Sequence, residues 1–155
     1  MKELSLIVLL SAAIFTGLAN FNFSNANEYS SVKCAVPKFD TAYKNAEAVF
    51  VGKVLAVEKD GDKKIIEFKI EKFWKGVNKA KVKISVYENF RFQSPYDVGE
   101  THLVFAKLNK DSEELWDGRC SRSKDLEGFS PDLKDDLEKL GEGKTNHQSN
   151  KRKNR

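Results

Sequence analysis

The chain has 155 residues, of which 40% are hydrophobic and 32% are charged; this suits one modest globular domain and leaves no room for two. The formal net charge is +4, but residues 142–155 hold five basic residues and one acid, so the rest of the chain sums to zero. A folded body without net charge does not attract phosphate backbones, which argues against a nucleic-acid-binding protein.

The first 26 residues are typical of a secretory signal peptide. A charged start precedes an apolar run from Leu4 to Leu18, and a small-residue site, Ser24-x-Ala26, follows it. A membrane-spanning helix needs about 20 apolar residues, and this run is shorter, so cleavage is favoured over anchoring. We therefore expect cleavage after Ala26 and a secreted, periplasmic or cell-envelope protein without a stable membrane anchor.

A short amphipathic helix is expected between Pro37 and Ala46, because apolar residues recur there at helical spacing. A long strand is expected from Val49 to Val57, where the residues that would point to either face of the strand are nearly all apolar. A strand of this kind is covered on both faces. Gly52 inside it marks a bulge or a sharp bend, as at the corner of a small barrel.

Four further strands follow from the hydrophobic pattern. Their residues are 66–73, which pair with the first strand through a turn at 58–62, then 80–87, 101–106, and a short strand beginning at Leu115. An irregular aromatic loop separates the third from the fourth. His102 on the fourth strand has no second candidate ligand beside it, so we expect a half-exposed sheet residue there.

A second helix is expected near the C-terminus. Ser130 would be its N-cap and Pro131 its first residue, three leucines follow at helical spacing, and Gly141 would end it. Residues 142–155 hold no apolar side chain to bury, so we expect a disordered basic tail. Together these elements predict a mainly β fold, a five-stranded OB-like β-barrel with a short N-terminal and a C-terminal helix, over residues 27–141.

The two cysteines, Cys34 and Cys120, follow a signal peptide, and in an oxidising compartment they most simply form one disulfide. Two free thiols remain the alternative. Two cysteines and two histidines, one of them His147 in the tail, do not make a credible zinc set. No cofactor or metal is expected.

Five sequence pieces resemble, in order, the netrin-like domain of the tissue-inhibitor-of-metalloproteinases family, especially its small bacterial members. They span about Cys34 to Ser123. They are Cys34-x-x-Pro37, Ala46-Glu47-Ala48-Val49-Phe50-Val51-Gly52-Lys53-Val54, Phe73-Trp74-Lys75-Gly76, Gly99-Glu100-x-x-Leu103-Val104-Phe105-Ala106, and Cys120-Ser121-Arg122-Ser123.

The sequence departs from this family at its opening. The family begins with Cys-x-Cys, and the first cysteine pairs with one in the loop before the fourth strand. Here Val32 takes the position of the first cysteine, and residues 90–94 hold no cysteine, so both cysteines of that bridge are absent. Cys34 and Cys120 match the other bridge of the family. In the animal inhibitors that first cysteine is the mature N-terminus and chelates the zinc of the protease, a role that Val32 does not match.

The resemblance implies a secreted protein-binding module, with inhibition of an extracytoplasmic protease as its sharper form. No catalytic set is evident, so we expect no enzyme. The best anchor candidates are aromatic or arginine side chains in the long loop, with core packing an equal alternative: Phe90, Arg91, Phe92 and Tyr96. The second hypothesis is an OB-fold binder of glycans or single-stranded nucleic acid, using these loop aromatics and three outward lysines, Lys79, Lys81 and Lys83.

Overall fold

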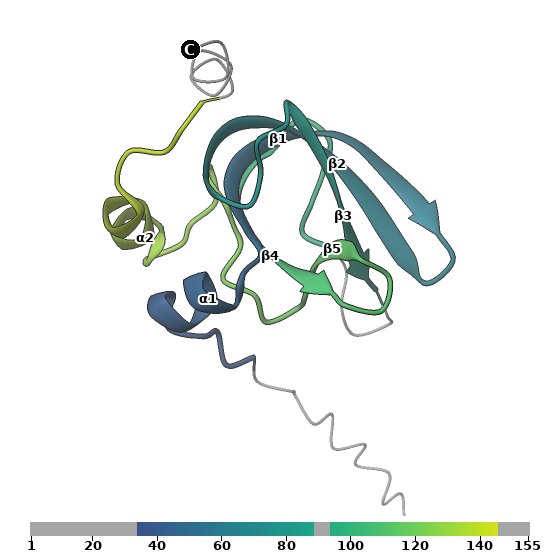
Figure 1. The fold of residues 1–155 in the computed structure, drawn as a ribbon, viewed down its shortest axis with the longest axis horizontal. Helices are drawn as coiled ribbons and strands as arrows, with labels where there is room; N and C mark the ends of the chain where they lie inside the picture. Colours follow the sequence, from purple (N-terminus) through teal and green to yellow (C-terminus); the bar gives the residue numbers. More distant parts are fainter. Residues whose placement is uncertain (1–33, 89–93, 146–155) are drawn as a thin grey trace, which may run out of the picture. The chain divides into compact units, whose positions relative to one another are not determined.

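The computed structural model describes residues 34–88 and 94–145. The segment with the expected signal peptide, residues 1–26, lies outside the described residues. The elements in chain order (Figure 1) are α1 Phe39–Asn45, β1 Ala48–Asp60, β2 Lys63–Lys75, β3 Lys81–Tyr87, β4 Thr101–Asn109, β5 Glu114–Asp117, β6 Lys124–Asp125 and α2 Leu133–Leu140. A mainly β fold with one helix before the strands and one after them is therefore confirmed.

Five strands form a closed ring. Neighbours pair in the order β1-β2-β3-β5-β4, and β1 pairs with β4 as well, which closes it. All pairs in the ring are antiparallel except β3 with β5, which run parallel through Ser85 and Trp116. The two-residue β6, which the sequence pattern did not predict, adds to β4.

Strand β1 is buried on both faces, as predicted. Phe50 and Val54 belong to the cluster inside the ring, whereas Val49 and Val51 belong to a second cluster beneath the helices. The pairing of β1 with β2 shifts register at Gly52, where an added Cβ would lie 3.1 Å from the Lys69 carbonyl oxygen. This close approach confirms the predicted irregularity and its need for glycine.

A further register shift in β1, between Val54 and Ala56, changes which side chains point into the ring. Simple alternation would put Val57 on the same face as Val49 and Val51, but Val57 packs against the cluster inside the ring with Phe50 and Val54. A bulge adds one residue to one strand and so changes the parity of every residue after it.

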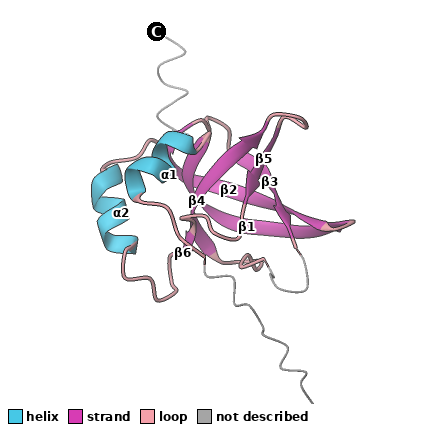
Figure 2. Ribbon diagram, turned by 90° about the horizontal axis from the view of Figure 1, so that it is seen from below, coloured by secondary structure: helices cyan, strands magenta, loops and turns pink. Residues whose placement is uncertain are grey.

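Both helices lie on the same side of the strand ring (Figures 1 and 2). They cover the second apolar cluster, to which α1 contributes Phe39 and Tyr43 and α2 contributes its three leucines. Helix α2 starts at Leu133 with Asp132 as its N-cap, so the predicted start at Ser130 and Pro131 is wrong. Its predicted end is confirmed, since Gly141 has a φ of 63° and its N–H bonds to the Leu137 carbonyl.

The described chain continues beyond Gly141 along β2. Phe73 N–H donates to the Lys144 carbonyl at 2.9 Å, and Lys144 N–H donates to the Phe73 carbonyl at 2.8 Å. The start of the predicted tail is thus paired with the domain, and residues 146–155 lie outside the described residues.

Candidate binding surfaces

Three of the four predicted anchor residues, Phe90, Arg91 and Phe92, lie outside the described residues, as does Val32, the position that matches the family's first cysteine. Tyr96 is described and is 1% exposed. Its ring packs edge-on against Phe68 at 5.4 Å and against His102 at 4.7 Å between ring centroids. Of the two roles left open for Tyr96, the structure gives it the role of a core residue.

Tyr96 belongs to a buried polar cluster with Asp117. Its hydroxyl donates to Asp117 Oδ2, and the Gly118 N–H donates to Asp117 Oδ1 at 3.0 Å. Burial raises the pKa of Asp117, although hydrogen bonds from Tyr96 and two serine hydroxyls oppose the shift. Burial and the Asp117 charge raise the pKa of Tyr96 well above its ordinary value. The cluster holds β5 to the loop before β4 and has no access for a ligand.

His102 is also fully buried, at 1% exposure, so the expectation of a half-exposed residue is wrong. Its Nε2 lies 3.0 Å from Glu100 Oε2, and its ring contacts Tyr96. Among residues 34–88 and 94–145 there is no group of three or more side chains that could hold a metal ion. Nor does that part of the chain contain a helix long and apolar enough to cross a membrane.

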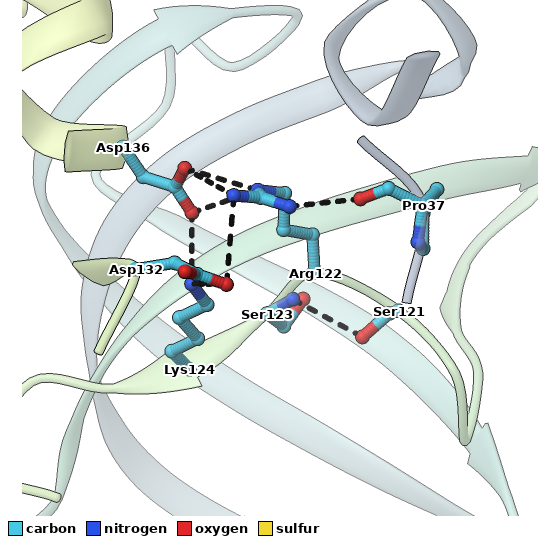
Figure 3. Close-up of polar contacts among 7 residues, drawn as sticks. All are labelled: Pro37, Ser121, Arg122, Ser123, Lys124, Asp132 and Asp136. Atoms are coloured by element: carbon cyan, nitrogen blue, oxygen red, sulfur yellow. Dashed lines mark hydrogen bonds and ion pairs between the residues drawn. The ribbon is translucent and has the colours of Figure 1, made fainter. Parts of the chain in front are cut away.

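A buried ion pair between Arg122 and Asp136 joins three segments (Figure 3). Arg122 Nε lies 2.8 Å from Asp136 Oδ2 and Nη2 lies 2.7 Å from Oδ1, while Nη1 donates to the Pro37 carbonyl at 2.8 Å. Lys124 Nζ adds a contact of 3.0 Å to Asp136 Oδ2. The pair therefore ties α2 to the segment before β6 and to the chain that enters α1.

Sequence reasoning missed this pair, although a signal for it exists. Asp136 falls three residues after Leu133 and four before Leu140, on the apolar face of α2, and it has no exposed surface. A carboxylate at such a position needs a buried cation. The sequence does not show which cation that is.

Cys34 and Cys120 form the predicted pair, with their sulfur atoms 2.07 Å apart. The bond joins the segment before α1 to the loop after β5. A disulfide of this kind indicates an oxidising, extracytoplasmic environment. Together with the Arg122 contact to Pro37, it fixes the entry into α1.

The loop between β6 and α2 presents a phenylalanine to solvent. Phe129 is 99% exposed. The loop that carries it is anchored, because Leu126 N–H donates to the Thr101 carbonyl at 2.9 Å and Glu127 N–H donates to Asp125 Oδ1 at 3.0 Å. The side chain of Leu126 packs into the apolar cluster beneath the helices. The backbone two and three residues before Phe129 is therefore held in place, while the Phe129 ring is exposed.

Two more exposed apolar residues lie near the same end of β4, Val98 at 65% and Leu55 at 37% exposure. Hydrogen bonds from Gly99 N–H to the Val54 carbonyl and from Val54 N–H to the Glu100 carbonyl join their two segments. The segments that carry these two residues and Phe129 are thus all bonded to the start of β4 or to the residue before it, and we call Phe129, Val98 and Leu55 the Phe129 surface.

The three lysines of the second hypothesis do lie together. Lys79, Lys81 and Lys83 line a cleft of about 510 Å³ between the β1–β2 hairpin, β3 and β5. The lining also contains three carboxylates, from Asp60, Glu113 and Glu114, and Lys81 is paired with Glu67 at 3.0 Å. This mixed charge suits a polyanion such as single-stranded nucleic acid poorly.

The accessible features of the described chain thus include an exposed apolar surface and a cleft of mixed charge, whereas Arg122, Asp136, Tyr96 and Asp117 are buried and bonded to one another in pairs. In comparisons with known proteins, the chain matches no protein-family model and no curated protein.

Proposed function

We propose that this protein is an exported protein-binding module with an OB-like barrel. The ring order β1-β2-β3-β5-β4, closed between β1 and β4, supports an OB-like five-stranded barrel. The Cys34–Cys120 bond supports both export and the resemblance to the netrin-like domain, in which a bridge matches these positions. Residues 1–26, as a cleaved signal peptide, would direct the export.

The observation that carries the binding function is Phe129. Full burial of a phenylalanine side chain is worth about 1.5 to 3 kcal/mol, and this ring is 99% exposed on a loop with an anchored backbone. Aromatic residues on a preorganised surface are typical centres of protein interfaces, since little ordering remains to be done on binding.

The charges around this surface indicate the kind of partner. Asp97 and Glu127 are exposed beside Val98 and Phe129, and neither has an ion-pair partner among the described residues. Complementary charges around an apolar centre steer association and set specificity. The proposed partner is therefore an extracytoplasmic protein with an apolar pocket flanked by lysine or arginine. The family resemblance further suggests that this partner is a protease.

The test compares single substitutions on and off the Phe129 surface. Immobilised wild-type protein, Phe129→Ala and the control Val36→Ala would capture proteins from the native extracytoplasmic fraction. Val36 is a matched control because it is 51% exposed and lies before α1. A specific partner, once purified, should bind wild type and Val36→Ala equally and Phe129→Ala at least about tenfold more weakly by calorimetry. Equal affinity for all three would rule out the Phe129 surface as the interface.

A further inference from the structure

A third surface feature lies near the other end of β4. A groove of about 440 Å³ is lined by Tyr87, Leu108, Asn109, Lys110 and Trp116. These residues come from β3, from β5 and from the end of β4 with the residue after it, so the groove crosses three neighbouring strands of the ring. The Phe129 surface is joined to Thr101, at the start of β4, whereas this groove is at Asn109.

Two aromatic side chains on adjacent parallel strands form the floor of the groove. Trp116 pairs with Ser85 of β3, and Tyr87 follows two residues later with 45% exposure. The indole of Trp116 leans over Gly118, where an added Cβ would lie 2.9 Å from Cζ3. Lys107 Nζ, from β4, lies 5.6 Å from the centre of the indole ring. The ring is thus held between β4 and Gly118, and any larger residue at position 118 would displace it.

The polar groups of the groove are mainly hydrogen-bond donors. Asn109 Oδ1 already accepts from the Asp111 N–H at 3.0 Å, which leaves its amide nitrogen to donate. Lys110 lines the groove and Lys107 lies over the indole. None of the five lining residues is acidic, unlike the lining of the lysine cleft. The groove therefore suits a ligand that is rich in acceptors and negatively charged.

We propose that this groove binds an acidic oligosaccharide, such as a chain of uronic acids. The exposed ring of Tyr87 would pack against the C–H face of a sugar ring, and the ammonium groups of Lys110, in the lining, and of Lys107, over the indole, would pair with the carboxylates. Aromatic grooves also receive proline-rich peptides, but such a peptide need not carry the negative charge that two lysines and an amide donor favour. The proposal is independent of the Phe129 surface.

The experiment uses fluorescence of the mature protein. Trp74 and Trp116 are the two tryptophans, and Trp74 lies on β2, with Nε1 bonded to the Gly141 carbonyl. In a Trp74→Phe background the emission therefore reports on Trp116 alone. Titration with tetragalacturonate should change that emission saturably and weaken as salt is added, whereas neutral maltotetraose should bind at least about tenfold more weakly.

Substitutions assign the binding to the groove. Tyr87→Ala and Lys110→Glu change exposed side chains, and in the same background each should weaken tetragalacturonate binding about tenfold, while Phe129→Ala should leave it unchanged. Trp116→Ala should abolish binding, measured by calorimetry together with the melting temperature to show that the protein is folded. The proposal would be overturned if tetragalacturonate does not bind or if maltotetraose binds equally well. It would also be overturned if the Tyr87→Ala and Lys110→Glu variants bind tetragalacturonate as tightly as the parent protein. Binding of a proline-rich decapeptide in place of the saccharide would overturn it too.

Discussion

Arg122 binds Asp136 through Nε and Nη2 at 2.8 and 2.7 Å, and the carboxylate that it binds has no exposed surface. Lys124 contacts the same carboxylate at 3.0 Å. Each cation has only one further carboxylate nearby, the exposed Asp132, at 3.9 Å from Arg122 and 3.8 Å from Lys124. Removing Asp136 therefore takes away the close, buried partner of both cations, whose side chains are only 10% and 11% exposed.

We predict that Asp136→Ala lowers the free energy of unfolding by about 3 to 5 kcal/mol, as expected for a buried ion pair that loses one partner. The control is Glu138→Ala, which removes an exposed contact of 3.8 Å to Lys134 on the same helix. An exposed pair of this kind contributes less than about 1 kcal/mol. Denaturant unfolding of both variants measures the difference, and similar small losses would show that the Arg122 contacts do not stabilise the fold.

The disulfide gives a second prediction. Peptide mapping of the exported protein should recover Cys34 and Cys120 in one linked peptide, which reductant separates. The bridge spans 86 positions of sequence, and closing a loop of that length stabilises a protein by about 4 to 5 kcal/mol in the simple chain-entropy model. The Cys34→Ser, Cys120→Ser variant should lose stability of this order, and two alkylatable thiols in native protein would contradict the pairing.

The features of the fold that could be predicted are those determined by residues adjacent in sequence, and the features that were missed depend on contacts between distant segments. The two-sided burial of β1 and the end of α2 at Gly141 follow from residues adjacent in sequence, and both are confirmed. Strand β6 has two residues and exists because β4 offers it an edge, so no periodicity predicts it. The inward position of Val57 depends on a further bulge, between Val54 and Ala56, that no glycine marks.

The candidate sites were harder to predict, because they depend on which side chains meet. Tyr96 of the loop before β4 was named as an anchor or, equally, a core residue, and it fills the core; Phe129, which was not named, is the most exposed large apolar side chain among the described residues. A single phenylalanine in a Gly-Phe-Ser-Pro stretch has no partner in the pattern that would indicate its exposure. His102 was expected to be half-exposed, and the packing of Tyr96 against its ring, which the sequence pattern does not show, helps to bury it.

The C-terminal segment supplies the third prediction, in which two truncations should differ. Removal of residues 146–155 should leave the melting temperature almost unchanged. Removal of residues 142–155 also deletes the two hydrogen bonds between Lys144 and Phe73, which together are worth about 1 to 3 kcal/mol. The expectation that the whole segment contributes nothing is thereby revised.

The matched comparison for these truncations is Phe50→Ala. Phe50 is fully buried and packs against Phe68 at 5.4 Å between ring centroids, so the cavity should cost about 3 to 5 kcal/mol. In thermal unfolding, removal of residues 146–155 should lower the melting temperature least, removal of residues 142–155 should lower it more, and Phe50→Ala should lower it most. A shorter truncation as damaging as Phe50→Ala would show that residues 146–155 pack against the domain.

Tyr96 gives a prediction about pH. Burial and the Asp117 charge raise its pKa in the folded protein well above 10.0, whereas the unfolded tyrosine ionises near 10. The stability that depends on the protonated phenol is thus present below pH 10 and is lost as the pH rises above it, by about 1.4 kcal/mol at pH 11. Denaturant unfolding at pH 8 and pH 11 should show a smaller loss in Tyr96→Phe than in wild type. Equal losses in the two proteins would show that ionisation of Tyr96 does not contribute to the pH dependence of stability.

The last prediction concerns the protease-inhibitor form of the proposal. We predict that the mature protein does not inhibit metalloproteinases by chelating their zinc. A catalytic zinc keeps one open position, and the animal inhibitors fill it with the α-amine and carbonyl of a bridged N-terminal cysteine. Here Val32 takes the place of that cysteine, and cleavage after Ala26 would put the N-terminus at Asn27, several residues before Cys34.

Without the bridge, holding those preceding residues in one conformation would cost roughly 1 to 2 kcal/mol each before any bond to the metal forms. Any inhibition should therefore come from the Phe129 surface and should survive acetylation of the α-amine. The assay runs purified mature protein, acetylated protein and Phe129→Ala against a panel of zinc proteases. Tight inhibition that acetylation removes and Phe129→Ala retains would show that the N-terminus chelates zinc without its cysteine. Inhibition lost only in Phe129→Ala would instead place the protease on the same surface as the proposed partner.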